Sequence, residues 1–250
     1  MTRPLDGKVA LVTGAGRNIG RAIALRLARD GAAVVVNGRS DAAAVAEVAA
    51  AIGAAGGAAM PVLADVSDPA AVGRMMEAVA ARFGGVDILV SNAGLRRQTA
   101  FLEMSLAEWR EILGVALDGA FILAKAAVPL MIGRGGGAIV ALSGISTHIG
   151  TANRCHVSAS KAGLEGLVRA LAVELAPHGI TANCVAPGSV DTQRGASAGV
   201  LPAGSNDDAV PLRRKASVEE IAGMVAYLVG REGAYVTGQT MHVNGGRYLT

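Results

Sequence analysis

Short apolar runs alternate along this chain with longer segments in which apolar residues recur every three or four positions. The runs are rich in β-branched residues and end at Gly, Asn, Asp or Pro, which is typical of buried strands. Strands are predicted at Val9 to Val12, Val34 to Val36, Pro61 to Ala64, Ile88 to Val90, Ala138 to Leu142, Thr181 to Val185 and Thr240 to Val243. Helices are predicted at Ile19 to Arg29, Ala42 to Ile52, Pro69 to Phe83, Leu106 to Ile132, Val157 to Leu175 and Val218 to Leu228. Strand and helix therefore alternate from one end of the chain to the other.

Continuous hydrophobic strands joined by helical crossovers predict a parallel sheet that is covered on both faces. The expected fold class is α/β, a single Rossmann-like doubly wound parallel sheet with helices on both faces. The chain has 250 residues, 52% of them hydrophobic, so residues 1–250 are expected to form one domain with an ample core. The irregular segment Gly188 to Pro211 is rich in Gly, Ser and Asp and is predicted to be a lid over a ligand.

Composition and charge argue against several classes of partner. The net charge is only +3 and the basic residues are scattered, so neither nucleic acid nor a membrane surface is expected as a partner. Cys155 and Cys184 have no metal-ligand spacing, and we expect no metal site. A pair of cysteines without a secretion signal fits a reducing cytoplasm, and charged residues are expected to interrupt every stretch of the roughly 20 apolar residues that would span a bilayer.

A glycine-rich turn follows the first predicted strand and opens the first helix. Gly permits a tight turn and close helix packing, and the amides at a helix N-terminus can face a pyrophosphate. The same pattern also occurs in ordinary strand-to-helix turns. The predicted dinucleotide-phosphate contacts in this turn are Gly14, Arg17, Asn18, Ile19 and Gly20.

The residues after the second strand bear on the choice of cofactor. An NAD site usually presents an acid here to the ribose hydroxyls, whereas this chain has Arg39 and Ser40. The Arg39 guanidinium, with Arg17 from the glycine-rich turn, matches a 2′-phosphate in charge and geometry. NADP is therefore predicted in preference to NAD, and the alternative is that Arg39 is a solvated surface charge.

Further motifs follow the glycine-rich turn: Ala64-Asp65-Val66, Ser91-Asn92-Ala93-Gly94 and Pro187-Gly188, with Thr192 four residues after the glycine. In their order these motifs resemble those of the short-chain dehydrogenase/reductase family, and the resemblance runs from about Leu5 to Gly246. The resemblance implies that Asp65 holds the adenine ring and that the Pro187-Gly188 loop, with Thr192, fixes the nicotinamide. Asn18 stands where the family's middle glycine falls, and Asn tolerates unusual backbone angles. The cofactor contacts implied by these motifs are Asp65, Val66, Asn92, Ala93, Gly94, Lys161, Pro187, Gly188 and Thr192.

This chain differs from the family pattern at the positions of the family's catalytic residues. The family's proton donor is a Tyr four residues before a Lys, and with Lys161 as that Lys the Tyr position is Val157. A hydrocarbon cannot donate a proton. The family's Ser and Asn positions align with Gly144 and Ala116, so that Lys161 alone remains of the four.

Nearby polar residues are candidate substitutes. Ser143 and Ser146 can offer hydroxyls, although each can equally serve loop hydrogen bonding. His156 titrates in a suitable range, but adjacent helical residues point about 100° apart, so it need not face the nicotinamide. His148 is a comparable candidate for contacting substrate, and Arg96 or Arg154 could bind an anionic group.

Two functions remain open. The first is an NADP(H)-dependent oxidoreductase that transfers hydride to or from a small carbonyl, alcohol or imine by a non-standard proton pathway. The second is a catalytically inactive NADP(H)-binding homologue that acts as a sensor or partner subunit. In either case the long helices Leu106 to Ile132 and Val157 to Leu175 resemble those that form four-helix interfaces, which implies a homotetramer or homodimer.

Overall fold

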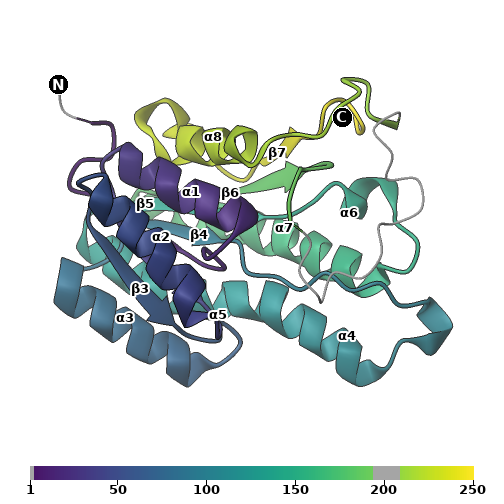
Figure 1. Ribbon diagram of the computed structural model, residues 1–250, viewed down its shortest axis with the longest axis horizontal. Helices are drawn as coiled ribbons and strands as arrows, with labels where there is room; N and C mark the ends of the chain where they lie inside the picture. Colours follow the sequence, from purple (N-terminus) through teal and green to yellow (C-terminus); the bar gives the residue numbers. More distant parts are fainter. Residues whose placement is uncertain (1–2, 194–208) are drawn as a thin grey trace.

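The computed structural model describes residues 3–193 and 209–250 (Figure 1). Within these residues the chain forms a seven-stranded sheet in the order β3-β2-β1-β4-β5-β6-β7, and every neighbouring pair of strands is parallel. The strands are β1 Val9–Val12, β2 Ala33–Gly38, β3 Ala59–Leu63, β4 Ile88–Ser91, β5 Gly137–Leu142, β6 Ile180–Pro187 and β7 Thr240–Val243. The predicted α/β fold class, a Rossmann-like parallel sheet, is confirmed.

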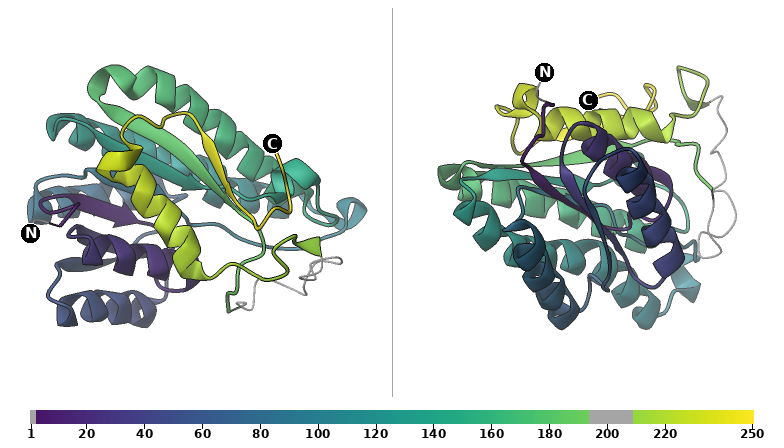
Figure 2. Two further views of the ribbon diagram at one scale, coloured as in Figure 1. Left: turned by 90° about the horizontal axis from the view of Figure 1, so that it is seen from above. Right: turned by 60° about the vertical axis from the view of Figure 1, so that its left-hand side comes forward.

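Helices cover both faces of the sheet, as the two views of Figure 2 show. One face carries α1, α2 and α8, and the other carries α3, α5 and α7. The α-helices are α1 Asn18–Arg29, α2 Ala42–Ala54, α3 Pro69–Phe83, α4 Leu106–Leu113, α5 Gly119–Gly133, α6 Ser146–Ile149, α7 Cys155–Leu175 and α8 Val218–Val229. Short 3-10 turns lie at Phe101–Glu103, Ala176–His178 and Arg231–Gly233.

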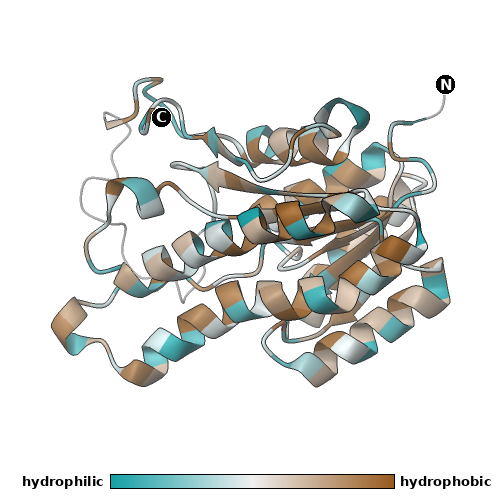
Figure 3. Cartoon of the chain, turned by 180° about the vertical axis from the view of Figure 1, so that it is seen from behind, coloured by the Kyte–Doolittle hydropathy of each residue, from teal (hydrophilic) through white to brown (hydrophobic). Residues whose placement is uncertain are grey.

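The central strand β1 shows why the buried strands are apolar along their whole length. Ala10 and Val12 pack under α1 and α8, while Val9 and Leu11 point to the opposite face, toward α3 and α5. Alternate residues of a strand point to opposite faces, so a sheet that is covered twice needs apolar side chains at every position. In Figure 3 the strands accordingly form a hydrophobic layer between the helices.

Most predicted elements shift by one or two residues at an end, and two of the differences have a physical reason. The edge strand β3 is Ala59–Leu63 rather than 61–64, because its residues alternate between half-buried and exposed and the hydrophobic signal is weak there. The predicted helix from Leu106 to Ile132 is divided by a π-helical turn, Gly114–Asp118, which joins α4 to α5. Such turns commonly mark functional sites.

The stretch Leu106–Gly133 also corrects the expectation that charges interrupt every apolar helix. Over these 28 residues the helix is long and apolar enough to cross a membrane, judged by length and composition only. It packs against α3 and α7 in the fold, with 39% of its most apolar window buried.

Strand order reverses beside β1, because the chain runs outward through β2 and β3 and then returns to place β4 on the other side of β1. In doubly wound sheets the loops that leave adjacent strands at this point diverge and leave a crevice at the carboxyl ends of the strands. The turn after β1 and the segment after β4 therefore face one another where a ligand is expected.

Candidate cofactor and substrate cavity

A cavity of about 610 Å³ opens at the carboxyl ends of the central strands. It is bounded by the loops after β1, β4, β5 and β6 and by the start of α7. The predicted cofactor contacts that line it are Gly14, Arg17, Asn18, Ile19, Gly20, Asn92, Ala93, Gly94, Lys161, Pro187, Gly188 and Thr192. The topology thus brings together motifs that are separated by more than half of the chain.

The glycine-rich turn is built so that helix α1 approaches the turn's backbone closely. A Cβ on Gly20 would lie 2.2 Å from the Gly14 carbonyl oxygen, a distance that carbon atoms do not reach. Gly14 itself has φ +60°. The Asn92 side chain ties the segment after β4 to this turn by donating to the carbonyls of Thr13 (2.8 Å) and Gly14 (3.2 Å). The residues at the start of α1 line the cavity, where an anion can approach the helix N-terminus.

Asn18 has a second role that sequence reasoning missed. Its φ is +51°, the left-handed conformation that Asn tolerates better than most residues. Its side-chain amide also donates to the Gln193 carbonyl and accepts from the Gln193 amide, both at 2.9 Å. Asn18 therefore fastens the glycine-rich turn to the segment that follows β6, a contact that glycine could not make.

Four of the predicted cofactor residues lie outside the described lining of this cavity: Arg39, Ser40, Asp65 and Val66. Arg39 and Ser40 are exposed and directly follow β2, whose Asn37 carbonyl accepts from the Ala15 amide of the glycine-rich turn. The carboxyl end of β2 is therefore hydrogen-bonded to the glycine-rich turn.

Asp65 lies within the electrostatic reach of Arg39. Partial burial raises the pKa of Asp65, but hydrogen bonds from Ser67 and the charge of Arg39 outweigh it, and the net pKa is lowered. Val66 is buried, and its side chain is in close contact with Gly119 of α5. Asp65, whose pKa is lowered, and Arg39 thus interact electrostatically beyond the carboxyl ends of β2 and β3.

Lys161 lies on the wall of the cavity. Its ammonium donates to the Leu142 carbonyl at the end of β5 and lies beside Gly94. Burial, together with the charge of Arg96, lowers the pKa of Lys161 to about 8. The Lys161 ammonium can donate hydrogen bonds to a ribose, and its pKa depends on other charges in the cavity.

The three positions at which the resemblance implies missing polar groups are divided between the cavity and the core. Val157 and Gly144 line the cavity, whereas Ala116 is buried in the π-helical turn. A Cβ on Gly144 would lie 3.8 Å from the Ser146 hydroxyl oxygen. Ser146 therefore places its hydroxyl next to the space that a serine at position 144 would occupy.

Ser143 also lines the cavity, but its hydroxyl points toward a buried carboxylate. It donates a short hydrogen bond to Glu165, which also accepts from His148 at 3.1 Å. The His148 ring stacks on Tyr248 and meets His242 edge-on. Ser143 is among the described residues that line the cavity, and His148 is not, although both contact the same buried carboxylate.

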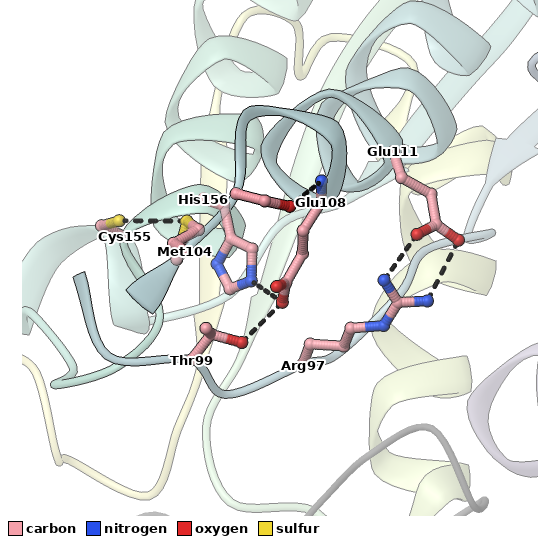
Figure 4. A network of polar contacts seen from close by, with 8 residues as sticks. Arg97, Thr99, Met104, Glu108, Glu111, Cys155 and His156 are labelled. Carbon is pink, nitrogen blue, oxygen red and sulfur yellow. Dashed lines mark hydrogen bonds and ion pairs between the residues drawn. The ribbon is translucent and has the colours of Figure 1, made fainter. Parts of the chain in front are cut away.

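His156 faces away from the cavity. It is fully buried, and its Nε2 lies 3.3 Å from the Glu108 carboxylate on α4, which also accepts from Thr99 at 2.6 Å (Figure 4). It is not among the described lining residues, although its neighbour Val157 is. The hypothesis that His156 donates a proton to substrate lacks the required geometry, because successive residues of a helix point about 100° apart.

Comparisons with known proteins agree with this architecture. The family model described as enoyl-(acyl carrier protein) reductase matches residues 14–247. The chain is 41% identical over 250 residues to the 3-oxoacyl-[acyl-carrier-protein] reductase FabG of Escherichia coli, covering 98% of both chains.

Solved structures are similar over the same length. A short-chain dehydrogenase from Burkholderia cenocepacia in complex with NADP has a TM-score of 0.89 at 36% identity, covering 98% of this chain and 99% of the other. A double mutant of a short-chain dehydrogenase/reductase from Serratia marcescens has a TM-score of 0.91 at 36% identity, with the same coverage. The chain therefore belongs to the short-chain dehydrogenase/reductase family.

Proposed function

We propose that this protein is an NADP(H)-dependent oxidoreductase that transfers hydride to or from a small carbonyl, alcohol or imine by a non-standard proton pathway. The observation that carries the proposal is one continuous cavity that runs from the glycine-rich turn to Lys161 and has Val157 on its wall. When bound, a nicotinamide dinucleotide supplies the hydride chemistry, and the protein supplies position and electrostatics.

The preference for NADP over NAD rests on charge at the adenosine end. Arg39 takes the place of the acid that would bind free ribose hydroxyls. Arg17, in the glycine-rich turn, adds a second positive charge for a 2′-phosphate. The Burkholderia cenocepacia relative, 36% identical, was solved with NADP. The residues at the start of α1 line the cavity, so that their amides can receive the pyrophosphate.

The side chains at the reacting end can orient a substrate but supply no phenol. Lys161 would hold the nicotinamide ribose through its ammonium, and Ser146 would donate a hydrogen bond to the substrate oxygen from beside Gly144. The proton then comes from water or from the substrate itself, which favours imines that are already protonated. Without a positioned acid, ordinary ketone reduction should be slower by about 10²- to 10⁴-fold.

A panel assay tests the proposal. Purified protein is first titrated with NADPH and NADH by fluorescence, and NADPH oxidation is then measured with ketones, aldehydes, cyclic imines and a 3-oxoacyl thioester. We expect tighter binding of NADPH and turnover that is fastest with an imine. Absence of binding to both nucleotides would refute the proposal.

The second candidate function is an NADP(H)-binding homologue without catalysis, a sensor or partner subunit. The specific observation in its favour is that Val157, Gly144 and Ala116 all lack a polar side chain. The double variant Val157→Tyr with Gly144→Ser separates the two proposals, since the nearest atom to a Cβ at position 144 is 3.8 Å away and a serine fits. Reductase activity that appears only in the variant favours the inactive homologue, whereas loss of a native activity favours the repurposed enzyme.

We further propose that residues 1–250 act as one domain and assemble as a homotetramer or homodimer. Phe121 on α5 and Val173 on α7 are 51% and 80% exposed, which suits a helix-to-helix interface. The proposed lid, 188–211, is described only in part, because residues 194–208 lie outside the described residues. Sedimentation analysis of the wild type and of Val173→Glu tests the assembly.

A further inference from the structure

Glu165 is a buried carboxylate for which the proposed reaction has no role. It lies on α7, one helical turn beyond Lys161 and two turns beyond Val157, so the three side chains share one face of the helix. Only 5% of the Glu165 side chain is exposed. A carboxylate rarely lies so deep in a protein unless hydrogen-bond donors surround it, and those donors determine where it can send or receive a proton.

Three side chains contact one oxygen of Glu165, its Oε1. The Ser143 hydroxyl, directly after β5, donates a short hydrogen bond, and the Thr147 hydroxyl lies at 3.5 Å. His148 Nε2 lies 3.1 Å away. Ser143 is among the residues that line the cavity, and 21% of the His148 side chain is exposed. A hydroxyl, a carboxylate and an imidazole therefore follow one another from the cavity wall to a partly exposed ring.

The direction of the Ser143 hydrogen bond suits the removal of a proton from the cavity. A serine hydroxyl has one proton to donate and two lone pairs that can accept. Because Ser143 donates its proton to Glu165, its oxygen can take a proton from a group in the cavity while it passes its own to the carboxylate. An imidazole gains and loses a proton readily near neutral pH, so His148 can exchange that proton with solvent.

Other titratable groups surround Glu165 on the neighbouring strands. Burial, with a contribution from Glu165, raises the pKa of Cys184 on β6 to about 12, so this thiol keeps its proton. Burial and the charge of His148 lower the pKa of His242 on β7, which Glu165 partly opposes. The remaining charged or titratable groups that act on or contact these residues are Lys161, Arg169 and Tyr248. His148 is thus the ring in direct contact with Glu165 and also partly exposed.

We propose that Ser143, Glu165 and His148 form a proton relay that takes the place of the absent tyrosine. In alcohol oxidation the C–H bonding pair leaves as hydride to NADP⁺, and the alcohol proton passes to Ser143 Oγ as the Ser143 proton passes to Glu165 Oε1. Glu165 then gives that proton to His148, which releases it to solvent. Carbonyl reduction runs the same steps in reverse.

Ser143 is the catalytic residue of this relay, and Glu165 and His148 are positioning residues that act through it. The inference rests on the proposed oxidoreductase function and supplies the route by which a proton from solvent water reaches the substrate. A serine hydroxyl is a weaker acid than a phenol, so the relay replaces the tyrosine only in part.

A permanently charged iminium provides the test, because its reduction needs hydride but no proton. The probes are 3,4-dihydro-2-methylisoquinolinium and 1-tetralone, which share a bicyclic frame, and kcat for each is measured by NADPH oxidation. The readout is the ratio of 1-tetralone turnover to iminium turnover. Ser143→Ala and Glu165→Gln should each lower this ratio by about 10²-fold, the lower end of the effect of a positioned proton donor. A purely structural role would lower both turnovers alike.

Two further variants test the outer end of the relay and the specificity of the effect. His148→Phe keeps an aromatic ring against Tyr248 but removes the exchangeable proton, so the ratio should fall and added imidazole should restore part of it. Thr147→Val is the matched control, because Thr147 contacts the same Glu165 oxygen but is not among the described residues that line the cavity. The ratio should be unchanged in this control.

The outcomes separate this inference from the proposed function. A ratio that stays at the wild-type value in Ser143→Ala would overturn the relay, and this variant decides alone if Glu165→Gln does not fold. Wild-type protein that reduces the iminium but no carbonyl would overturn the relay and leave the oxidoreductase intact. Protein that binds NADPH and reduces neither probe would overturn the relay and favour the inactive homologue. Failure to bind NADPH would refute the proposed function instead.

Discussion

Gly20→Ala is the sharpest test of the phosphate turn, because the added methyl carbon has no space. It would lie 2.2 Å from the Gly14 carbonyl oxygen and 2.6 Å from Asn92 Nδ2, a side-chain nitrogen that is itself held by two carbonyls. Carbon and oxygen do not pack closer than about 3.3 Å, so helix α1 and the turn must separate by roughly 1 Å. Both nearest groups are fixed, and no flexible side chain can absorb the displacement.

The size of the effect follows from this displacement. Overpacking of a tight site costs about 1–3 kcal/mol, and we expect the upper part of that range for the free energy of unfolding. A shift of roughly 1 Å also takes the amides at the start of α1 out of hydrogen-bond range of a pyrophosphate. Loss of two charge-assisted bonds at about 1.5–3 kcal/mol each predicts an NADPH affinity that is lower by about 10²- to 10⁴-fold.

The assay combines denaturant unfolding with fluorescence titration of NADPH. Gly73→Ala is the matched control, because Gly73 lies inside α3 and a Cβ there would meet nothing within 4 Å. In a helix interior the same substitution should stabilise the protein by about 0.5–1 kcal/mol and leave the affinity for NADPH unchanged. A Gly20→Ala protein that matched the wild type in both stability and NADPH affinity would refute the reasoning about this turn.

Three further predictions concern charged residues. Arg39→Ala should weaken NADPH by about 10- to 100-fold and leave NADH unchanged, and equal loss for both nucleotides in a fluorescence titration would contradict the 2′-phosphate role. Because burial and Arg96 lower the pKa of Lys161 to about 8, its amine loses its positive charge as pH rises through that value, so NADPH affinity should fall in titrations above about pH 8. Lys161→Met should bind NADPH weakly at every pH, and a pH dependence that survives this substitution would point to another group. Asp87→Ala should lower the free energy of unfolding by at least about 2 kcal/mol, as measured with denaturant, because buried Asp87 accepts from the Val9 amide and pairs with Lys8 and Arg134. A loss within about 0.5 kcal/mol would contradict that account.

Local pattern was sufficient for most of the elements and for the cofactor turn. Strand β1 and helix α3 begin and end at the predicted residues, because a buried strand reads as a continuous apolar run and Asp68 with Pro69 marks a helix start. The requirement for glycine at position 20 was also readable, since tight approach of helix and turn is a property of contiguous sequence. Periodicity failed at the edge strand β3, where half-exposed residues weaken the signal.

Contacts between distant segments were decided only by the tertiary structure. The sequence pointed to both Asn18 and His156. It did not reveal that the Gln193 backbone holds Asn18, or that Glu108 contacts His156 outside the described lining of the cavity. Arg96 and Arg154 are separated by almost sixty positions, and both line the cavity because parallel strands deliver their following segments to one edge of the sheet. The sequence gives the chemical type of each side chain, whereas the direction in which the side chain points and the charges near it depend on packing across the sheet.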